Sequence, residues 1–191
     1  MVGNEFTEII ALHSKLAKRI KQFEQITGEH PRVKTLSELR YTLRAVLVLI
    51  SENDELAEDT IGETPISKEQ AKERALHALY CAYHDLVDGV LIDLTEYMRH
   101  FTENFTEASI EVLGKKRQDI LETIEEVEIY ISEAREHGLK RSKIYDEIIY
   151  DQYFVKLVNY KNEIGKTLLL EIVQLDKELK NQRNNDDEMP N

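Results

Sequence analysis

The chain has 191 residues, 41% of them hydrophobic and 32% charged, with 7 glycines, 3 prolines and no tryptophan. This length suits one domain with its own hydrophobic core, and so few turn-forming residues exclude a strand-rich fold and favour long helices. The formal net charge is -12, an excess to which nearly every segment is expected to contribute; it argues against nucleic acid or a membrane surface as a direct partner, because both attract lysine and arginine.

The first predicted helix covers about residues 4–27. Apolar side chains recur along it with helical period, and His13 falls inside this apolar stripe. Gly28 and Pro31 then mark the helix end, since a glycine followed by a proline is the usual stop signal. The apolar positions are Phe6, Ile9, Ile10, Leu16, Ala17, Ile20 and Phe23.

The second predicted helix begins at Thr35, which forms a capping-box pattern with Glu38 three residues later. The run of residues 45–50 is apolar all round. Such a run predicts either deep burial or an intermolecular surface, and a short strand is the alternative assignment. The apolar stripe of this helix consists of Leu36, Leu39, Leu43, Val46 and Ile50.

The third predicted helix starts at Ser67, which pairs with Gln70 in another capping box, and runs to about residue 102. Its apolar arc covers nearly half of the circumference, which predicts contact with more than one neighbour and a central place in the fold. The arc consists of Ala75, Leu76, Leu79, Tyr80, Ala82, Tyr83, Leu86, Val87, Val90, Leu91, Leu94, Tyr97, Met98 and Phe101.

A fourth helix is predicted after a cap at Asn104 and Glu107, and a fifth after Ser142. Both repeat apolar residues in steps of three and four, which is typical of a hairpin with coiled-coil-like packing. The predicted fold class is therefore all-α, an antiparallel bundle of about five long helices whose last two form this hairpin. It makes a single helical-bundle domain over residues 1–180, followed by a disordered acidic tail over 181–191.

The sequence also indicates a compartment. Cys81 is the only cysteine, which fits a reducing environment. The first residues lack the basic region and apolar run of a signal peptide, and no apolar stretch approaches the roughly 20 residues that span a bilayer. We therefore expect a soluble, cytoplasmic protein.

Five side chains form a polar ladder along the third helix, at intervals of four, four, three and four: Glu73, His77, Cys81, His84 and Asp88. Imidazole and carboxylate groups are ligands of transition metals, so His77, His84 and Asp88 are the candidate metal ligands. The alternative is a solvated polar stripe, because the ladder lies opposite the apolar arc.

Four further polar residues fall in or beside apolar stripes, where an unpartnered polar group costs about 1–3 kcal/mol. They are His13, Asp93, His100 and Arg117. One interpretation is a ligand or proton-transfer pocket between helices. The other is a structural network with satisfied partners.

No catalytic motif is recognised, so the sequence favours a non-enzymatic protein without a cofactor. The leading hypothesis is a protein-protein interaction or regulatory protein that acts through helix-face surfaces, with a protein partner and self-association into a homo-oligomer. One alternative is a metal- or small-ligand-binding bundle that uses the His and carboxylate residues of the third helix. Another is an acidic inhibitor that mimics the charge of nucleic acid.

Overall fold

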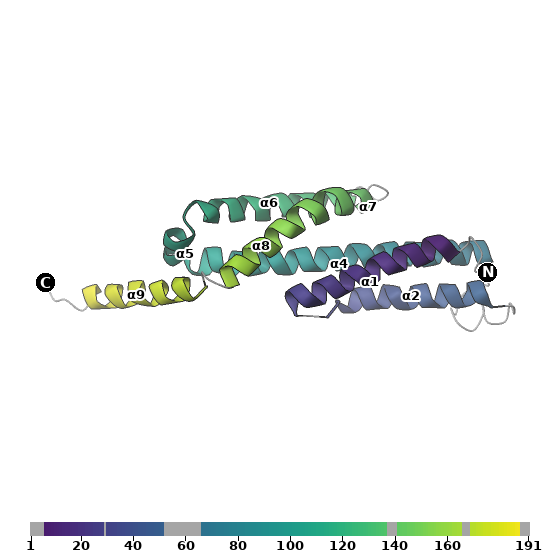
Figure 1. The fold of residues 1–191 in the computed structure, drawn as a ribbon, viewed down its shortest axis with the longest axis horizontal. Coiled ribbons are helices and arrows are strands. Elements are labelled where there is room, and N and C mark those ends of the chain that lie inside the picture. Colours follow the sequence, from purple (N-terminus) through teal and green to yellow (C-terminus); the bar gives the residue numbers. More distant parts are fainter. Residues whose placement is uncertain (1–5, 29, 52–65, 137–140, 166–168, 188–191) are drawn as a thin grey trace. The chain divides into compact units, whose positions relative to one another are not determined.

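The computed structural model of the chain describes residues 6–28, 30–51, 66–136, 141–165 and 169–187. Every regular element in these ranges is helical, which confirms the all-α prediction (Figure 1). Over the same ranges, no helix combines the length and the apolar character needed to traverse a bilayer. The chain divides into two compact units, Met1–Val90 and Leu91–Asn191, where the sequence predicted one domain over residues 1–180.

The first unit contains α1 (Thr7–Thr27), α2 (Val33–Ile50) and the beginning of α4 (Lys68–Asn104). Gly28 ends α1 as predicted: it adopts a left-handed conformation with φ of 73°, and its N–H donates to the carbonyl of Glu24. The capping box at the start of α4 is also confirmed, because the backbone N–H of Ser67 donates to Gln70 Oε1 at 2.9 Å and that of Gln70 to Ser67 Oγ at 3.2 Å.

The predicted capping box at Thr35 is wrong. Helix α2 begins two residues earlier, at Val33, after the extended residue Arg32. Thr35 is therefore inside the first turn, where its side chain is fully buried. A capping box requires its first residue to stand just before the helix, and Arg32 occupies that position instead.

Helices α1 and α2 run alongside the first part of α4 (Figure 1). Two contacts join them to it: Lys15 Nζ lies 4.8 Å from the ring centre of Tyr83, and Lys34 Nζ lies 2.9 Å from Asp85 Oδ1. The core of this unit is made of Leu12, Leu16, Phe23, Ala45, Val48, Leu49, Leu79, Ala82, Tyr83, Leu86 and Val87.

The second unit contains the end of α4, then α5 (Thr106–Leu113) and α6 (Lys115–Glu136). The predicted fourth helix is thus divided at Gly114, which has φ of 52°. The predicted cap at Asn104 is wrong, because this residue is the last of α4 and its Nδ2 contacts His100 Nδ1 at 2.7 Å. Helix α5 ends at Gly114, whose positive φ is a glycine conformation that the pattern of apolar residues does not predict.

The predicted fifth helix is also divided, into α7 (Arg141–Lys143), a π-helix η3 (Ile144–Phe154), α8 (Val155–Glu163) and α9 (Leu169–Asp187). Helix α6 packs against η3 and α8, and α5 packs against α9. Helix α9 extends to Asp187, inside the segment expected to be disordered. The antiparallel five-helix bundle with its hairpin stays a prediction.

Candidate functional site

Most of the large apolar side chains that are exposed in the described part of the first unit lie along α2. Leu36 is 50% exposed, Leu43 59%, Leu47 40% and Ile50 60%. Together with the exposed residue Arg40 they follow at steps of four, three, four and three, so they share one side of the helix. We call these five residues the outer face of α2.

The buried side of α2 carries smaller residues. Thr35, Thr42, Ala45, Val48 and Leu49 are buried, while the predicted stripe is only half-buried at Leu39 and Val46 and exposed at its other three positions. The run 45–50 accordingly divides, with Leu47 and Ile50 facing outward. The apolar stripe was correctly identified, but most of it does not enter the core.

Between α1 and α2 lies an apolar groove of about 450 Å³. Leu43 belongs both to this groove and to the outer face of α2, so the two surfaces are continuous. His13 is exposed and adds an imidazole to an otherwise uncharged lining, instead of being buried in an apolar stripe as expected. The lining residues are Ile9, Ile10, His13, Leu39, Thr42, Leu43 and Val46.

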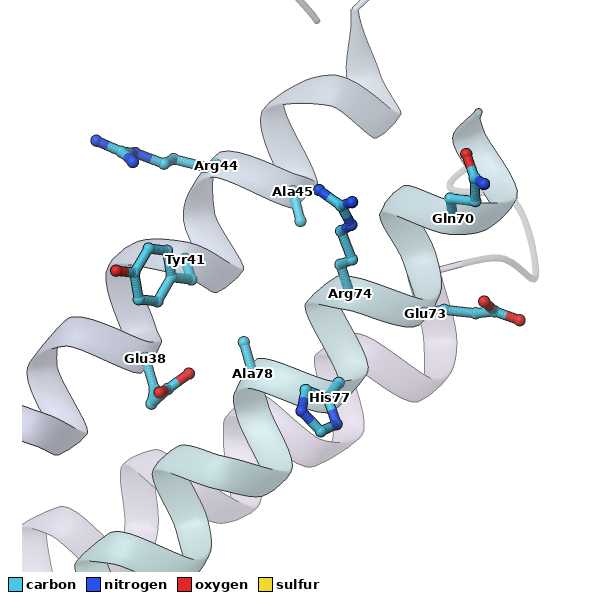
Figure 2. Close-up of a pocket in the computed structure, with 9 residues that line it drawn as sticks. All are labelled: Glu38, Tyr41, Arg44, Ala45, Gln70, Glu73, Arg74, His77 and Ala78. Atoms are coloured by element: carbon cyan, nitrogen blue, oxygen red, sulfur yellow. The ribbon is translucent and has the colours of Figure 1, made fainter. Parts of the chain in front are cut away.

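A second groove, of about 540 Å³, lies between α2 and α4 and is more polar (Figure 2). Ala45 and Ala78 line it from opposite helices, and Arg74 extends from α4 toward α2, whereas Glu73 points away. The complete lining is Glu38, Tyr41, Arg44, Ala45, Gln70, Glu73, Arg74, His77 and Ala78.

The polar ladder of α4 is solvated only over its first half. His77 is exposed and its Nε2 lies 3.6 Å from Cys81 Sγ. His84 and Asp88 are buried, with 7% and 6% exposed, so the expected solvated stripe is wrong for these two residues. Across the residues that the structure describes, no three His, Cys, Asp or Glu side chains are placed to hold a metal ion, and the metal hypothesis stays a prediction.

The other polar candidates are divided between the two units. His13 lies in the first unit, and Asp93, His100 and Arg117 lie in the second. Asp93 is half-buried, whereas His100 is exposed and makes edge-on ring contacts with Phe101. His100 Nδ1 lies 2.7 Å from Asn104 Nδ2, a neighbour on the same helix, so the position of His100 follows from local packing.

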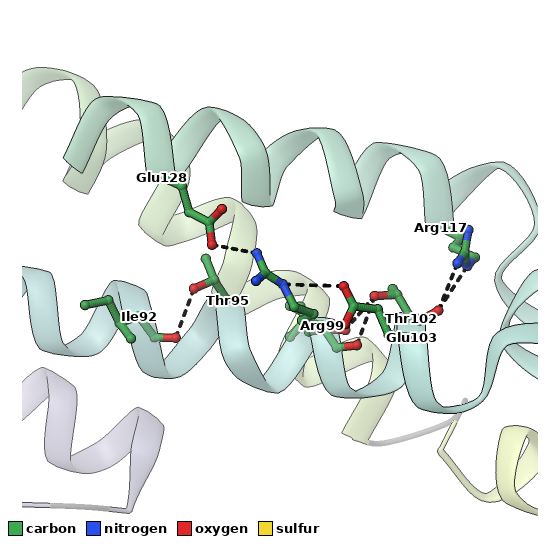
Figure 3. A network of polar contacts seen from close by, with 8 residues as sticks. Ile92, Thr95, Arg99, Thr102, Glu103, Arg117 and Glu128 are labelled. Atoms are coloured by element: carbon green, nitrogen blue, oxygen red, sulfur yellow. Dashed lines mark hydrogen bonds and ion pairs between the residues drawn. The ribbon is translucent and has the colours of Figure 1, made fainter. Parts of the chain in front are cut away.

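Arg117 acts at the end of α4 (Figure 3). Its Nη2 and Nε donate to the carbonyl oxygen of Thr102, at 2.9 and 3.3 Å. Carbonyls in the last turn of a helix lack intrahelical donors, and a guanidinium also complements the negative end of the helix dipole. A nearby arginine, Arg99, pairs with Glu103 and Glu128 in the same view. The two hydrogen bonds to Thr102 explain why Arg117 interrupts the apolar stripe of α6, because its side chain caps the end of α4.

The start of the chain is poor in acidic side chains and has a positive net charge, contrary to the expectation of a uniform acidic excess. Residues 1–51 hold eight basic and five acidic side chains, a net charge of +3. The remaining residues hold 17 basic and 32 acidic side chains, a net charge of -15. A count of charge by segment finds this asymmetry directly.

No family model matches the chain, and neither a curated protein nor a solved structure matches it. The outer face of α2 and its two flanking grooves are therefore interpreted from their own geometry.

Proposed function

We propose that this chain is a non-enzymatic protein-protein interaction or regulatory protein whose partner binds the outer face of α2. The observation that supports the proposal is the exposure of four large aliphatic side chains, Leu36, Leu43, Leu47 and Ile50, on one side of one helix. Single exposed apolar residues are ordinary on protein surfaces, but several of them along one side of a helix are typical of a binding site.

The energetics favour covering this row. Full burial of a leucine or isoleucine contributes about 1.5–3 kcal/mol. Because Leu36, Leu43, Leu47 and Ile50 are each 40–60% exposed, a partner that covers them gains roughly 1 kcal/mol from each. A few apolar anchors of this kind dominate the affinity of many protein complexes.

The shape of the surface favours a helical ligand. The apolar groove between α1 and α2 runs beside the exposed row and shares Leu43 with it. A concave apolar strip next to a helix is the kind of site into which an amphipathic helix places residues at i, i+3, i+4 and i+7.

The proposal is tested by site-specific cross-linking in cells of the source organism. A photoreactive phenylalanine analogue at position 43 is expected to form a discrete adduct with a partner protein, and Leu47→Glu is expected to abolish it. The matched control is the same analogue at position 129, because Ile129 is similarly exposed, at 50%, on α6. No adduct from position 43, or the same adduct from both positions, contradicts the proposal.

A further inference from the structure

We infer that the segment bound by the outer face of α2 is an acidic amphipathic helix. This inference rests on the proposed function and specifies the chemistry of the partner. It follows from the charges that border the exposed apolar row.

The basic residues of α2 border its outer face. Arg40 lies between Leu36 and Leu43 in the repeating steps of four and three, and Arg44 follows one turn later at the edge of the α2–α4 groove. Glu38 is the only acidic residue of α2, and it lines the α2–α4 groove instead of the outer face. A helix laid along the row therefore meets guanidinium groups beside its apolar contacts.

Helix α1, which forms the other wall of the apolar groove, has a net positive charge, although no described lysine or arginine belongs to the groove lining. Helix α1 carries four basic side chains, Lys15, Lys18, Arg19 and Lys21, against Glu8 and Glu24. With the three basic residues and one acidic residue of α2, the two helices hold seven positive and three negative side chains. This net positive charge of α1 and α2 favours a ligand with carboxylates.

The charges next to the outer face of α2 determine this preference more than the net charge of the chain does. At physiological ionic strength the Debye length is about 8 Å, so exposed charges farther away are largely screened. An acidic helix on the outer face of α2 is therefore governed mainly by Arg40 and Arg44, which border that face. Arginine also pairs with carboxylates in a bidentate geometry, which adds specificity.

The charge and the shape of this surface disfavour two other occupants. If α2 paired with α2 of a second copy about a two-fold axis, Arg40 and Arg44 of each copy would border the same seam and repel each other. An anionic bilayer is flat, whereas the groove of about 450 Å³ is concave.

The test uses the full chain and two designed helical peptides with the same leucine seam, one flanked by glutamate and the other by lysine. Fluorescence anisotropy is expected to show binding of the glutamate peptide at least tenfold tighter than that of the lysine peptide, with affinity falling as salt is raised. The double variant Arg40→Glu and Arg44→Glu is expected to reverse the preference. The control is Lys115→Glu with Lys177→Glu, an equal charge change at exposed residues of α6 and α9, which is expected to leave the preference unchanged.

Four results overturn the inference. If both peptides bind equally and Leu43→Glu abolishes both, the face binds helices without charge selection, and the proposed function stands. If neither peptide binds, the acidic-helix assignment fails, and the cross-linking at position 43 decides the proposed function separately.

If sedimentation shows a dimer that Leu43→Glu dissociates, the occupant is a second copy. If phosphatidylserine vesicles bind while both peptides do not, the ligand is a membrane surface. Circular dichroism of each variant confirms that the fold is retained.

Discussion

Thr35 illustrates how a single side chain departs from the pattern of its helix. Its side chain is fully buried, and its hydroxyl has no hydrogen-bond partner among the residues that the structure describes. An unsatisfied buried hydroxyl costs about 1–3 kcal/mol, and replacing it by a methyl group of the same shape removes that cost. Thr35→Val is therefore expected to raise the free energy of unfolding by about 1 kcal/mol in denaturant titrations.

Thr42 on the same helix provides the control. It is 5% exposed, but its hydroxyl donates to the carbonyl of Glu38 at 3.0 Å. Thr42→Val removes a hydrogen bond that Thr35 does not make, so its gain in stability is expected to be smaller. An equal or larger gain from Thr42→Val would show that the hydroxyl of Thr35 carries no cost.

Tyr153 is expected to ionise late. Desolvation by burial, followed by a hydrogen bond to the Glu126 carboxylate, raises the pKa of Tyr153 from 10.0 to about 12. The folded state thus holds the phenolic proton more tightly than the unfolded chain, so the stability contributed by this group is present below pH 10 and is lost as the pH rises toward 12.

A pH titration of tyrosinate absorbance checks this prediction, over the range in which circular dichroism shows the fold intact. Tyr153→Phe is expected to remove a step near pH 12, and Glu126→Gln is expected to shift that step toward 10. A titration that Tyr153→Phe leaves unchanged above pH 11 contradicts the assignment.

For single residues, the sequence predicts hydrogen bonds within one helical turn better than it predicts which side chains are buried. The pairing of Ser67 with Gln70 could be predicted because both partners lie within one turn and require no tertiary contact. His84 and Asp88 could not be assigned to a buried surface, because their helical position marks them as opposite the apolar arc. Burial on all sides depends on how many neighbours surround α4, which one helix does not encode.

At the scale of the element, α2 should show opposite responses on its two sides. Leu43→Ala on the outer face is expected to change the free energy of unfolding by less than about 1 kcal/mol, because this residue is 59% exposed. Leu49→Ala on the buried side is expected to cost about 2–5 kcal/mol, because the residue is 7% exposed and its removal leaves a cavity. Equal costs at the two positions would mean that the exposed row is covered in the isolated chain.

The break between α5 and α6 depends on Gly114. Its backbone, with φ of 52° and ψ of -128°, is a conformation that residues with a Cβ adopt at a cost of about 1–3 kcal/mol. Gly114→Ala is therefore expected to destabilise the chain by about that amount in thermal or denaturant unfolding. Gly165→Ala is the control: its added Cβ would lie 3.7 Å from Tyr97 Oη, an ordinary contact, so no loss of similar size is expected.

The π-helix η3 shows why a search with the α-helical period misses a buried residue. Hydrogen bonds from i to i+5 widen each turn, so Tyr145, Tyr150 and Phe154 reach the buried side at steps of five and four. A template with 3.6 residues per turn passes over Tyr145, which lies five residues before Tyr150, whereas Phe154 follows Tyr150 by an ordinary step of four. The existence of helical structure from 141 onward was predictable, whereas its winding was not.

For the whole molecule, composition predicts the fold class and leaves the distribution of surfaces open. The scarcity of glycine and proline predicts an all-α chain, and the described residues confirm it. The division into two units was not predicted, because both units draw on the long apolar arc of α4, which reads as one continuous core. The candidate site was predicted in part, since the all-apolar run 45–50 marked α2 as a possible intermolecular surface.

The position of the single cysteine has a practical consequence. Cys81 is half-buried on α4, one turn from His77, which lines the groove between α2 and α4. A thiol-reactive fluorophore therefore attaches at one chemically defined place without any engineered residue, and its emission responds to the polarity of its surroundings. The native chain thus offers an attachment site for a fluorescent label. With this label, binding of unlabelled ligands at the groove between α2 and α4 can be followed in real time.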